Sequence, residues 1–413
     1  MRPRDAICTV AATAVLLCWG CSEDSGASST GGVPGTGATG GTGAIGGTSG
    51  TGGLDPGLVE QGQDIFRNDT FGDEALWTDV LGLHTVIATA VDPLTALAVG
   101  LKVDAAALPE GILDTVDLTD PATTVALLKL DAVVGLKGTV EEIDGEDVLT
   151  SVGITCASCH STVNDSVIPG IGERLDGWPN RDFNPGLILS LSPALQDPAT
   201  QAVLRSWGPG KYDAYWNQDG INDPQVIPPA YGLADVDLET FTGEGPVSYW
   251  NAYVAVTQMG GQGRFVDERL GLDIDADPDL VTPKLEALRA YQLSLPAPSP
   301  PPGSFDTAAA TRGKALFEGD ARCASCHLGS ALTDANDTLH SVGEVGQDPT
   351  LASRGTTGMY RTTPLRGAWQ HPPYFHDGSA ATFDDVVDHY DTLLGLGLTE
   401  DQQSDLVEYL LSL

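Results

Sequence analysis

The chain has 413 residues and a formal net charge of −37 at pH 7, from 57 acidic and 20 basic side chains. So acidic a protein is poorly suited to bind nucleic acid or the anionic face of a membrane, and we expect neither as a partner. The length allows two or three domains, each with a core of its own.

The first residues have the pattern of an export signal. Two arginines precede a short apolar run from Ala6 to Trp19, which is too short for a good transmembrane helix. The run ends in Leu17-Cys-Trp-Gly-Cys21, which resembles a bacterial lipoprotein box, so we predict a signal peptide at residues 1–20 and lipidation of Cys21. An ordinary signal peptide cleaved nearby is the alternative. By resemblance to lipoproteins, Ser22 favours the outer membrane of a Gram-negative envelope, with the chain on its periplasmic side.

Residues 21–54 are predicted to be a flexible tether. Residues 25–53 are almost wholly Gly, Thr, Ser and Ala and carry no charge, so they cannot bury enough surface to fold. Such a tether spans on the order of 30 Å. Without residues 1–20, 18 basic and 56 acidic side chains remain, a net charge of −38.

A Cys-Ala-Ser-Cys-His stretch occurs twice, at residues 156–160 and 323–327. C-x-x-C-H is the attachment signature of a c-type haem, in which the thiols bond to the vinyl groups and the histidine binds iron. A single copy could also be a thioredoxin-like redox pair or half of a zinc site. The other three of the seven cysteines fall in the first 21 residues, which leaves no thiol for a disulfide. We therefore predict two covalent haems, attached at Cys156, Cys159, Cys323 and Cys326, with His160 and His327 as iron ligands.

Each motif lies between a first and a last helix of similar pattern. Asp55-Pro56 and Asp306-Thr307 predict helix starts, and each of these helices has a glycine four residues before a phenylalanine: Gly62 and Phe66, Gly313 and Phe317. The closing helices are predicted from Thr282-Pro283 and from a capping box of Thr399 and Gln402. Their apolar residues repeat at i, i+3 and i+7: Leu288, Tyr291 and Leu295, then Leu406, Tyr409 and Leu413.

This pairing of helices resembles the class I cytochrome c fold, in which the glycine lets the first and last helices cross closely. We predict a mainly α protein with two such domains, at residues 55–295 and 306–413, joined by a proline-rich linker at 296–305. The first domain is enlarged by an insertion at about residues 69–150. A further segment, from Ile171 to Arg264, is predicted to be mostly loop.

The C-terminal region resembles the bacterial di-haem cytochrome c peroxidase and MauG family over residues 306–413, and residues 55–295 resemble it loosely. The resemblance rests on Thr363-Pro-Leu-Arg-Gly367, on Pro373-Tyr-Phe-His-Asp-Gly378 and on a following helix. Gly367 replaces the usual asparagine, and one residue before the leucine is missing. In the family, the residue fourteen positions after the HDG histidine is the distal ligand of the C-terminal haem, which implies Tyr390 here. The competing ligands are His371, His376, His389 and Met359.

The first domain offers Met259 as the distal ligand of its haem, whereas His84 is expected to be structural. The family's F-W-D-G-R run is replaced by Tyr249-Trp-Asn251, and its catalytic Gln and Glu have no clear counterpart. The candidates for catalysis by proton transfer are Gln258, Gln262 and Trp250. The resemblance also suggests a calcium ion between the domains, without indicating its ligands.

The resemblance implies a di-haem oxidoreductase, in which electrons pass from the C-terminal haem to a reactive N-terminal haem. The alternative is a non-enzymatic electron-transfer cytochrome of the cell envelope, favoured by Met259 and by the weak match to the catalytic run. A haem-based sensor is a third possibility for which the sequence has no positive evidence. The acidic charge favours a basic electron-donor protein as redox partner, although it would also serve solubility alone.

Overall fold

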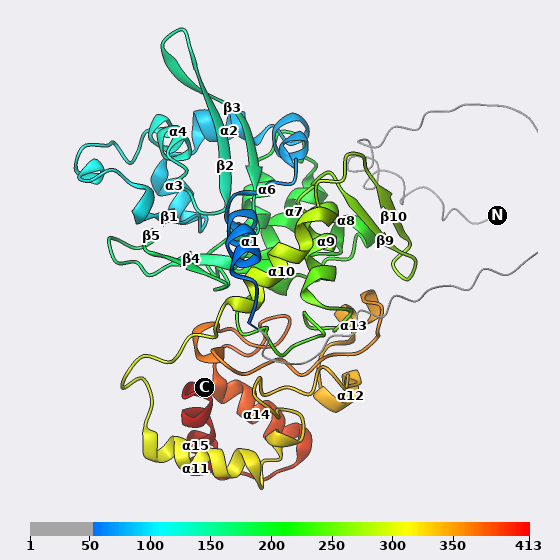
Figure 1. Cartoon of the computed structure of the whole chain (residues 1–413). Coiled ribbons are helices and arrows are strands. Elements are labelled where there is room, and N and C mark those ends of the chain that lie inside the picture. The colour runs from blue at the N-terminus through cyan, green and yellow to red at the C-terminus, as the bar shows by residue number, and fades with distance from the viewer. Residues whose placement is uncertain (1–52) are drawn as a thin grey trace, which may run out of the picture.

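The computed structural model describes residues 53–413, which form two lobes (Figure 1). The larger lobe contains the first haem motif, and the smaller lobe contains the second. The predicted signal peptide, Cys21 and nearly all of the tether lie outside the described residues. Within residues 53–413, no helix is long and apolar enough to cross a membrane.

The larger lobe is built on the crossing of α1 (Pro56–Asn68) and α10 (Leu285–Ser294). The Asp55 carboxylate caps α1 by accepting a hydrogen bond from the backbone N–H of Gly57 at 2.8 Å. A Cβ atom on Gly62 would overlap the carbonyl oxygen of Ala287, so only glycine permits this approach of the two backbones. Beside it, the rings of Phe66 and Tyr291 pack edge to face at 5.4 Å.

The smaller lobe repeats this arrangement with α11 (Thr307–Glu318) and α15 (Glu400–Leu411). Of the two predicted caps, Asp306 or Thr307, the structure forms the cap at Asp306, and the predicted capping box of Thr399 and Gln402 is also formed. A Cβ atom on Gly313 would overlap the carbonyl oxygen of Asp405, and the rings of Phe317 and Tyr409 lie 5.1 Å apart. The predicted class, mainly α with the helix crossing of cytochrome c, is therefore confirmed.

Replacing Gly313 by alanine should lower the free energy of unfolding by about 1–3 kcal/mol, because the new methyl group forces two helix backbones apart. Gly343, in α12 (Val342–Val345), is the matched control, since a Cβ atom there meets nothing within 4 Å. Denaturant unfolding followed by circular dichroism measures both variants. Equal stability of Gly313→Ala and Gly343→Ala would contradict the close crossing.

The insertion forms a compact cap on the larger lobe. Its helices and short strand are η2 (Ala75–Val80), α2 (Leu83–Ala90), α3 (Pro93–Ala98), β1 (Val103–Asp104), η3 (Ala105–Ala107), η4 (Ile112–Asp114) and α4 (Pro121–Lys129). Of these, η2, α2 and α4 pack against an antiparallel hairpin of β2 (Leu136–Ile143) and β3 (Glu146–Ile154), in which Leu136 pairs with Ile154. The hairpin thus ends two residues before Cys156 and fixes where the first haem motif begins.

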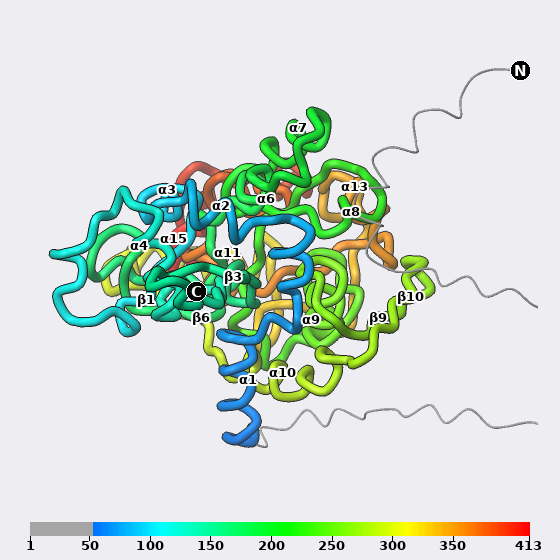
Figure 2. The backbone as a smooth tube through the Cα atoms, turned by 90° about the horizontal axis from the view of Figure 1, so that it is seen from above, coloured from blue at the N-terminus to red at the C-terminus, as the bar shows by residue number. Residues whose placement is uncertain are grey.

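The segment after the first motif contains more regular structure than predicted. Its elements are α5 (Ala157–His160), β4 (Ser161–Val163), β5 (Ile171–Gly172), β6 (Arg174–Asp176), α6 (Pro185–Ser190), α7 (Pro198–Trp207), β7 (Lys211–Tyr212), α8 (Trp216–Asp219), β8 (Gln225–Val226), α9 (Val247–Thr257), β9 (Arg264–Asp267), β10 (Leu272–Asp275) and η5 (Thr282–Lys284). The prediction of loop was wrong for α9, which is apolar on most of its faces and therefore lacks the periodic pattern of a surface helix. Seen from above, α1 and α7 extend from opposite edges of the molecule (Figure 2).

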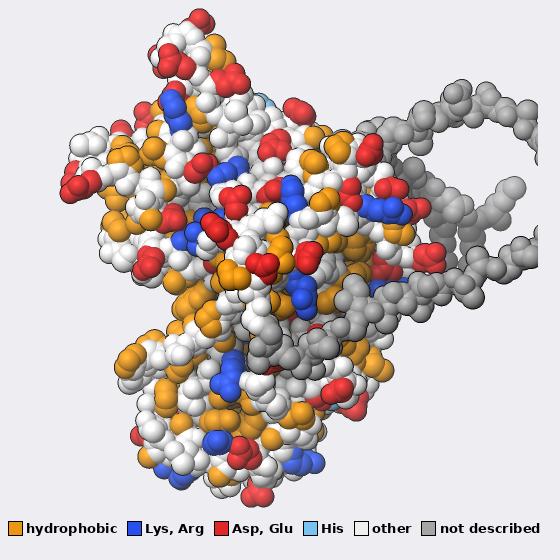
Figure 3. Space-filling view, viewed as in Figure 1, with side chains coloured by type: hydrophobic (Ala, Val, Ile, Leu, Met, Phe, Trp, Pro, Cys, Tyr) orange, Lys and Arg blue, Asp and Glu red, His pale blue; other side chains and the backbone are white. Residues whose placement is uncertain are grey.

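The smaller lobe is completed by η6 (Cys323–Ser325), α12, η7 (Ala368–Gln370) and α14 (Phe383–Leu394). Helix α13 (Pro349–Arg354) comes from the same part of the chain but packs into the core of the larger lobe through Leu351 and Ala352. The proline-rich linker packs against the smaller lobe, because the indole N–H of Trp369 donates to the carbonyl of Pro298 at 3.1 Å. Acidic side chains are scattered over the visible face of both lobes and form no single patch there (Figure 3).

A buried arginine at the end of α13 holds this C-terminal segment of the chain against the larger lobe. Arg354 is only 2% exposed at its side chain. Its guanidinium is 2.7 Å from the carboxylate of Asp213, 2.7 Å from that of Asp219 and 3.6 Å from that of Asp223. The three acidic residues lie within eleven positions of one segment, so the single cation offsets part of their negative charge and holds this segment of the larger lobe against α13.

Candidate haem sites

The first motif is held from two sides by backbone hydrogen bonds. On the hairpin side, the hydroxyl of Ser158 donates to the carbonyl of Gly135 at 2.6 Å. On the other side, the N–H groups of Gly177 and Asn180 donate to the carbonyls of His160 and Cys159, each at 2.8 Å. Both flanks of the motif are therefore held by the surrounding chain.

The two motif histidines are oriented in the same way. Nδ1 of His160 lies 3.0 Å from the carbonyl oxygen of Pro228, and Nδ1 of His327 lies 3.0 Å from that of Leu332. A carbonyl only accepts, so Nδ1 carries the proton and Nε2 is left free for a metal. Burial lowers the pKa of His160 to about 4 and also lowers the pKa of His327. Both imidazoles are thus neutral, which is the form that binds iron.

Each motif opens onto its own cavity. The cavity at Cys323, Cys326 and His327 has a volume of about 490 Å³, and the cavity at Cys156, Cys159 and His160 about 280 Å³. Their other walls are mainly aliphatic and aromatic. A deep apolar pocket with two thiols and one free imidazole nitrogen at its edge fits a covalently attached haem in both lobes.

The thiols do not fit the alternatives. Burial raises the pKa of Cys156 to about 12 and that of Cys323 to about 11, whereas a reactive dithiol has a lowered pKa. Among the described residues, Cys326, Asp334 and His340 are the only group of three or more side chains placed to share a metal ion. Zinc needs four ligands in a closed structural site, and Cys326 is better explained as a haem attachment point.

The two cavities share one wall. Five apolar residues of the larger lobe line both of them: Val226, Pro228, Pro229, Leu233 and Phe241. One of these, Pro228, also accepts the hydrogen bond from His160. The two sites are therefore separated by a single layer of chain.

Residues 310–413 match the family model described as cytochrome c. The smaller lobe is a cytochrome c domain. Two curated proteins are also similar: cytochrome-c peroxidase IdrP1 of Denitromonas iodatirespirans, at 32% identity over 25% of this chain and 39% of that protein, and the methylamine utilization protein MauG of Methylorubrum extorquens, at 39% identity over 20% of this chain and 24% of that protein. The chain thus spans well under half the length of either relative, and the predicted resemblance is confirmed as a distant one.

Two solved structures align with about half of the chain. A MauG-like protein associated with microbial copper homeostasis aligns over 48% of this chain and 75% of its own, at 20% identity and a TM-score of 0.33. Hydrazine synthase of Kuenenia stuttgartiensis aligns over 48% of this chain and 74% of its own, at 20% identity and a TM-score of 0.34.

Within the cytochrome c domain, the structure separates the competing distal ligands. Tyr390, His371 and His376 line the cavity. His389 does not, since its Nε2 lies 2.9 Å from the carbonyl of Val345, and Met359 is 40% exposed.

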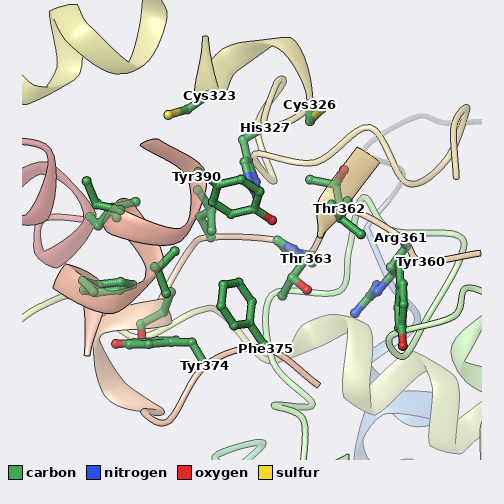
Figure 4. A pocket seen from close by; sticks show the side chains of 18 of the residues that line it. Cys323, Cys326, His327, Tyr360, Arg361, Thr362, Thr363, Tyr374, Phe375 and Tyr390 are labelled. Carbon is green, nitrogen blue, oxygen red and sulfur yellow. The ribbon is translucent and has the colours of Figure 1, made fainter. Parts of the chain in front are cut away.

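Figure 4 shows the ring of Tyr390 projecting into the space between His327 and Phe375. Burial raises the pKa of Tyr390 to about 12, and its hydroxyl makes no hydrogen bond to any described residue. In contrast, Nε2 of His376 lies 3.4 Å from the hydroxyl of Tyr360. Nδ1 of His376 is also buried and without a partner among the described residues. Tyr390 and His376 therefore both remain candidates, and the role of Tyr390 as ligand stays a prediction.

In the larger lobe, only some of the site residues predicted from the sequence lie at the first cavity. Met259, Gln258 and Trp250 line the first cavity, and Met259 is 3% exposed. Gln262 and His84 do not line it. The structure therefore does not bring the side chain of Gln262 to the haem site.

The structure adds charged residues that the sequence did not indicate. Glu239 lines the first cavity and Arg361 lines the second, and they form an ion pair of 3.1 Å through the wall between them. Burial raises the pKa of Glu239 to about 6. Only the proximity of Arg361 to the Thr363-Pro run, in a chain with few basic residues, could have pointed to this pair.

Proposed function

We propose that the chain is a di-haem c-type oxidoreductase of the peroxidase or MauG type, with one haem at each motif. The observation that carries this proposal is that two cavities, each with a C-x-x-C-H motif at its edge, share a wall one layer thick. A bound haem supplies a reversible one-electron change and, where one axial position is free, a place for peroxide to bind.

The protein residues have distinct proposed tasks. His160 and His327 would each bind a haem iron through Nε2, and Tyr390 would supply a second protein ligand in the cytochrome c domain. In the larger lobe, Oε1 of Glu239 is buried and has no hydrogen bond to a described residue. With a pKa of about 6, this carboxyl can hold or release a proton near neutral pH. Glu239 thus supports the reaction in the first cavity better than Gln262.

A second candidate function is electron transfer alone. Met259 lines the first cavity and is almost fully buried. If its thioether binds iron there, both haems have two strong protein ligands, and neither offers a position to peroxide.

The electronic absorption and EPR spectra of the oxidised protein distinguish the oxidoreductase from the electron-transfer protein. For the oxidoreductase we expect one high-spin haem, and oxidation of a reduced dye or cytochrome when hydrogen peroxide is added. Met259→Ala should then leave the spectra unchanged, while Tyr390→Phe changes the signals of the other haem. For the electron-transfer protein, the wild type is low-spin throughout and Met259→Ala converts one haem to high-spin. Met359→Ala, at an exposed residue, and His389→Asn, on the same helix as Tyr390, are the matched controls.

Three further points stay proposals. Export with lipidation at Cys21 would place the described lobes on the periplasmic side of the envelope. A basic electron donor would suit the acidic surface, and its rate of reaction should fall as salt is added; a rate independent of salt would count against it. Calcium has no assigned ligands.

A further inference from the structure

Arg181 belongs to the larger lobe, but its side chain lines the cavity of the cytochrome c domain. One guanidinium nitrogen, Nη2, donates to the backbone carbonyl of His371 at 2.7 Å. The other two, Nε and Nη1, are buried and have no hydrogen bond to any described residue. Two strong donors are thus left without an acceptor.

The charge of Arg181 is also unbalanced. No described carboxylate lies within salt-bridge distance of the Arg181 guanidinium, whereas Arg361 in the same cavity is paired with Glu239. The titratable groups that face Arg181 are Tyr231, Tyr374 and His371. Burial raises the pKa of both tyrosines and lowers the pKa of His371 to about 3. All three are neutral at pH 7, and the pKa of Arg181 is lowered only to about 10.

A buried cation without a counter-ion is costly, and proteins pair such groups or bind an anion beside them. A guanidinium presents its N–H groups as a planar fork that matches a carboxylate. We propose that Arg181 binds a carboxylate of the cavity's ligand, a propionate group of the haem attached at Cys323 and Cys326. This inference rests on the haem of the cytochrome c domain and is independent of the proposed catalytic function.

Arg181 follows a residue that is bound to the first haem motif, so a propionate contact at Arg181 would also link the two haem sites. The preceding residue, Asn180, donates its backbone N–H to the carbonyl of Cys159 and its side-chain amide to the carbonyl of Gly100. The chain is therefore bound to the first haem motif at Asn180 and reaches the second cavity one residue later. A propionate on Arg181 would connect the second haem directly to the segment that holds the first.

The test is an EPR-monitored redox titration of the complete holoprotein in Arg181→Gln, Arg181→Lys and the control Arg289→Gln. Arg289 is an exposed arginine on α10 of the same lobe. Reduction adds negative charge at the haem, so loss of the Arg181 charge should lower the midpoint potential of the cytochrome c domain haem alone. Arg181→Lys should recover most of that shift, and Arg289→Gln should cause none. The EPR signal of the cytochrome c domain haem is identified as the signal that is missing from the double variant Cys323→Ser/Cys326→Ser.

Three results would overturn the proposal. The first is that neither potential changes in Arg181→Gln, and the second is that only the potential of the larger-lobe haem changes. The third is that the wild-type potential depends on added phosphate or chloride, as expected if a free anion occupies the site. Should Arg181→Gln fail to fold, the resonance Raman bands of the propionates are compared in Arg181→Lys and wild type. A shift of one band supports the contact, and identical spectra contradict it.

Discussion

Cys323→Ser/Cys326→Ser should contain half of the covalently bound haem of the wild-type protein. Each motif opens onto a separate cavity, so loss of the thiols in one lobe leaves the other attachment site intact. Cys156→Ser/Cys159→Ser should lose the other half, and the fourfold variant should lose all of it. The thioether bonds survive denaturation, and thus the haem that remains after extraction with acidic acetone reports attachment alone.

Haem content is measured from the pyridine haemochrome spectrum and from the mass of the intact chain. Ser325→Ala is the matched control, because Ser325 lies between the two thiols and its hydroxyl bonds only to the backbone of Arg322 and to the Cys326 sulfur. It should keep both haems. A full haem content in either double variant would show that the motif concerned does not attach haem.

Arg354→Met should lower the free energy of unfolding by about 3–5 kcal/mol, the usual cost of removing one partner from a buried ion pair. The guanidinium is almost inaccessible to solvent and contacts Asp213, which is fully buried, as well as Asp219. Without it, those carboxylates lie close together with no counter-charge. Denaturant unfolding of the holoprotein, followed by circular dichroism, measures the loss.

Two comparisons make the Arg354 result specific. Arg289→Met removes an exposed arginine and should change stability by less than about 0.5 kcal/mol. Arg354→Met combined with Asp213→Asn should be more stable than Arg354→Met alone, because one unpaired buried charge is gone. If the single variant is as stable as Arg289→Met, the charge cluster does not stabilise the contact between α13 and the larger lobe.

The sequence predicts the features that depend on local chemistry. The caps at Asp55, Asp306 and Thr399 each involve residues within three positions of one another, and all three form as predicted. The crossing glycines could also be identified, because Gly62 and Gly313 occupy the same place in a repeated pattern. Such signals are contained in short windows of sequence.

What the sequence does not predict depends on contacts between distant segments. Glu239 and Arg361 are 122 positions apart, and their ion pair becomes visible only in the folded chain. Arg181 and His371 are 190 positions apart. The same holds for the shared wall at residues 226–241, whose apolar residues have no distinctive spacing. Helix α9 was missed for a related reason, since a helix buried on most sides has no polar face to reveal its period.

Because the larger lobe supplies part of the second cavity, the cytochrome c domain is not a self-sufficient unit. A fragment beginning at the linker would lack Arg181, Pro228 and Phe241, and its haem would be more exposed to solvent. Water stabilises the charged ferric centre, so the isolated domain would be a stronger reductant than the same domain in the intact chain. Measurements on such a fragment would therefore describe a different redox couple.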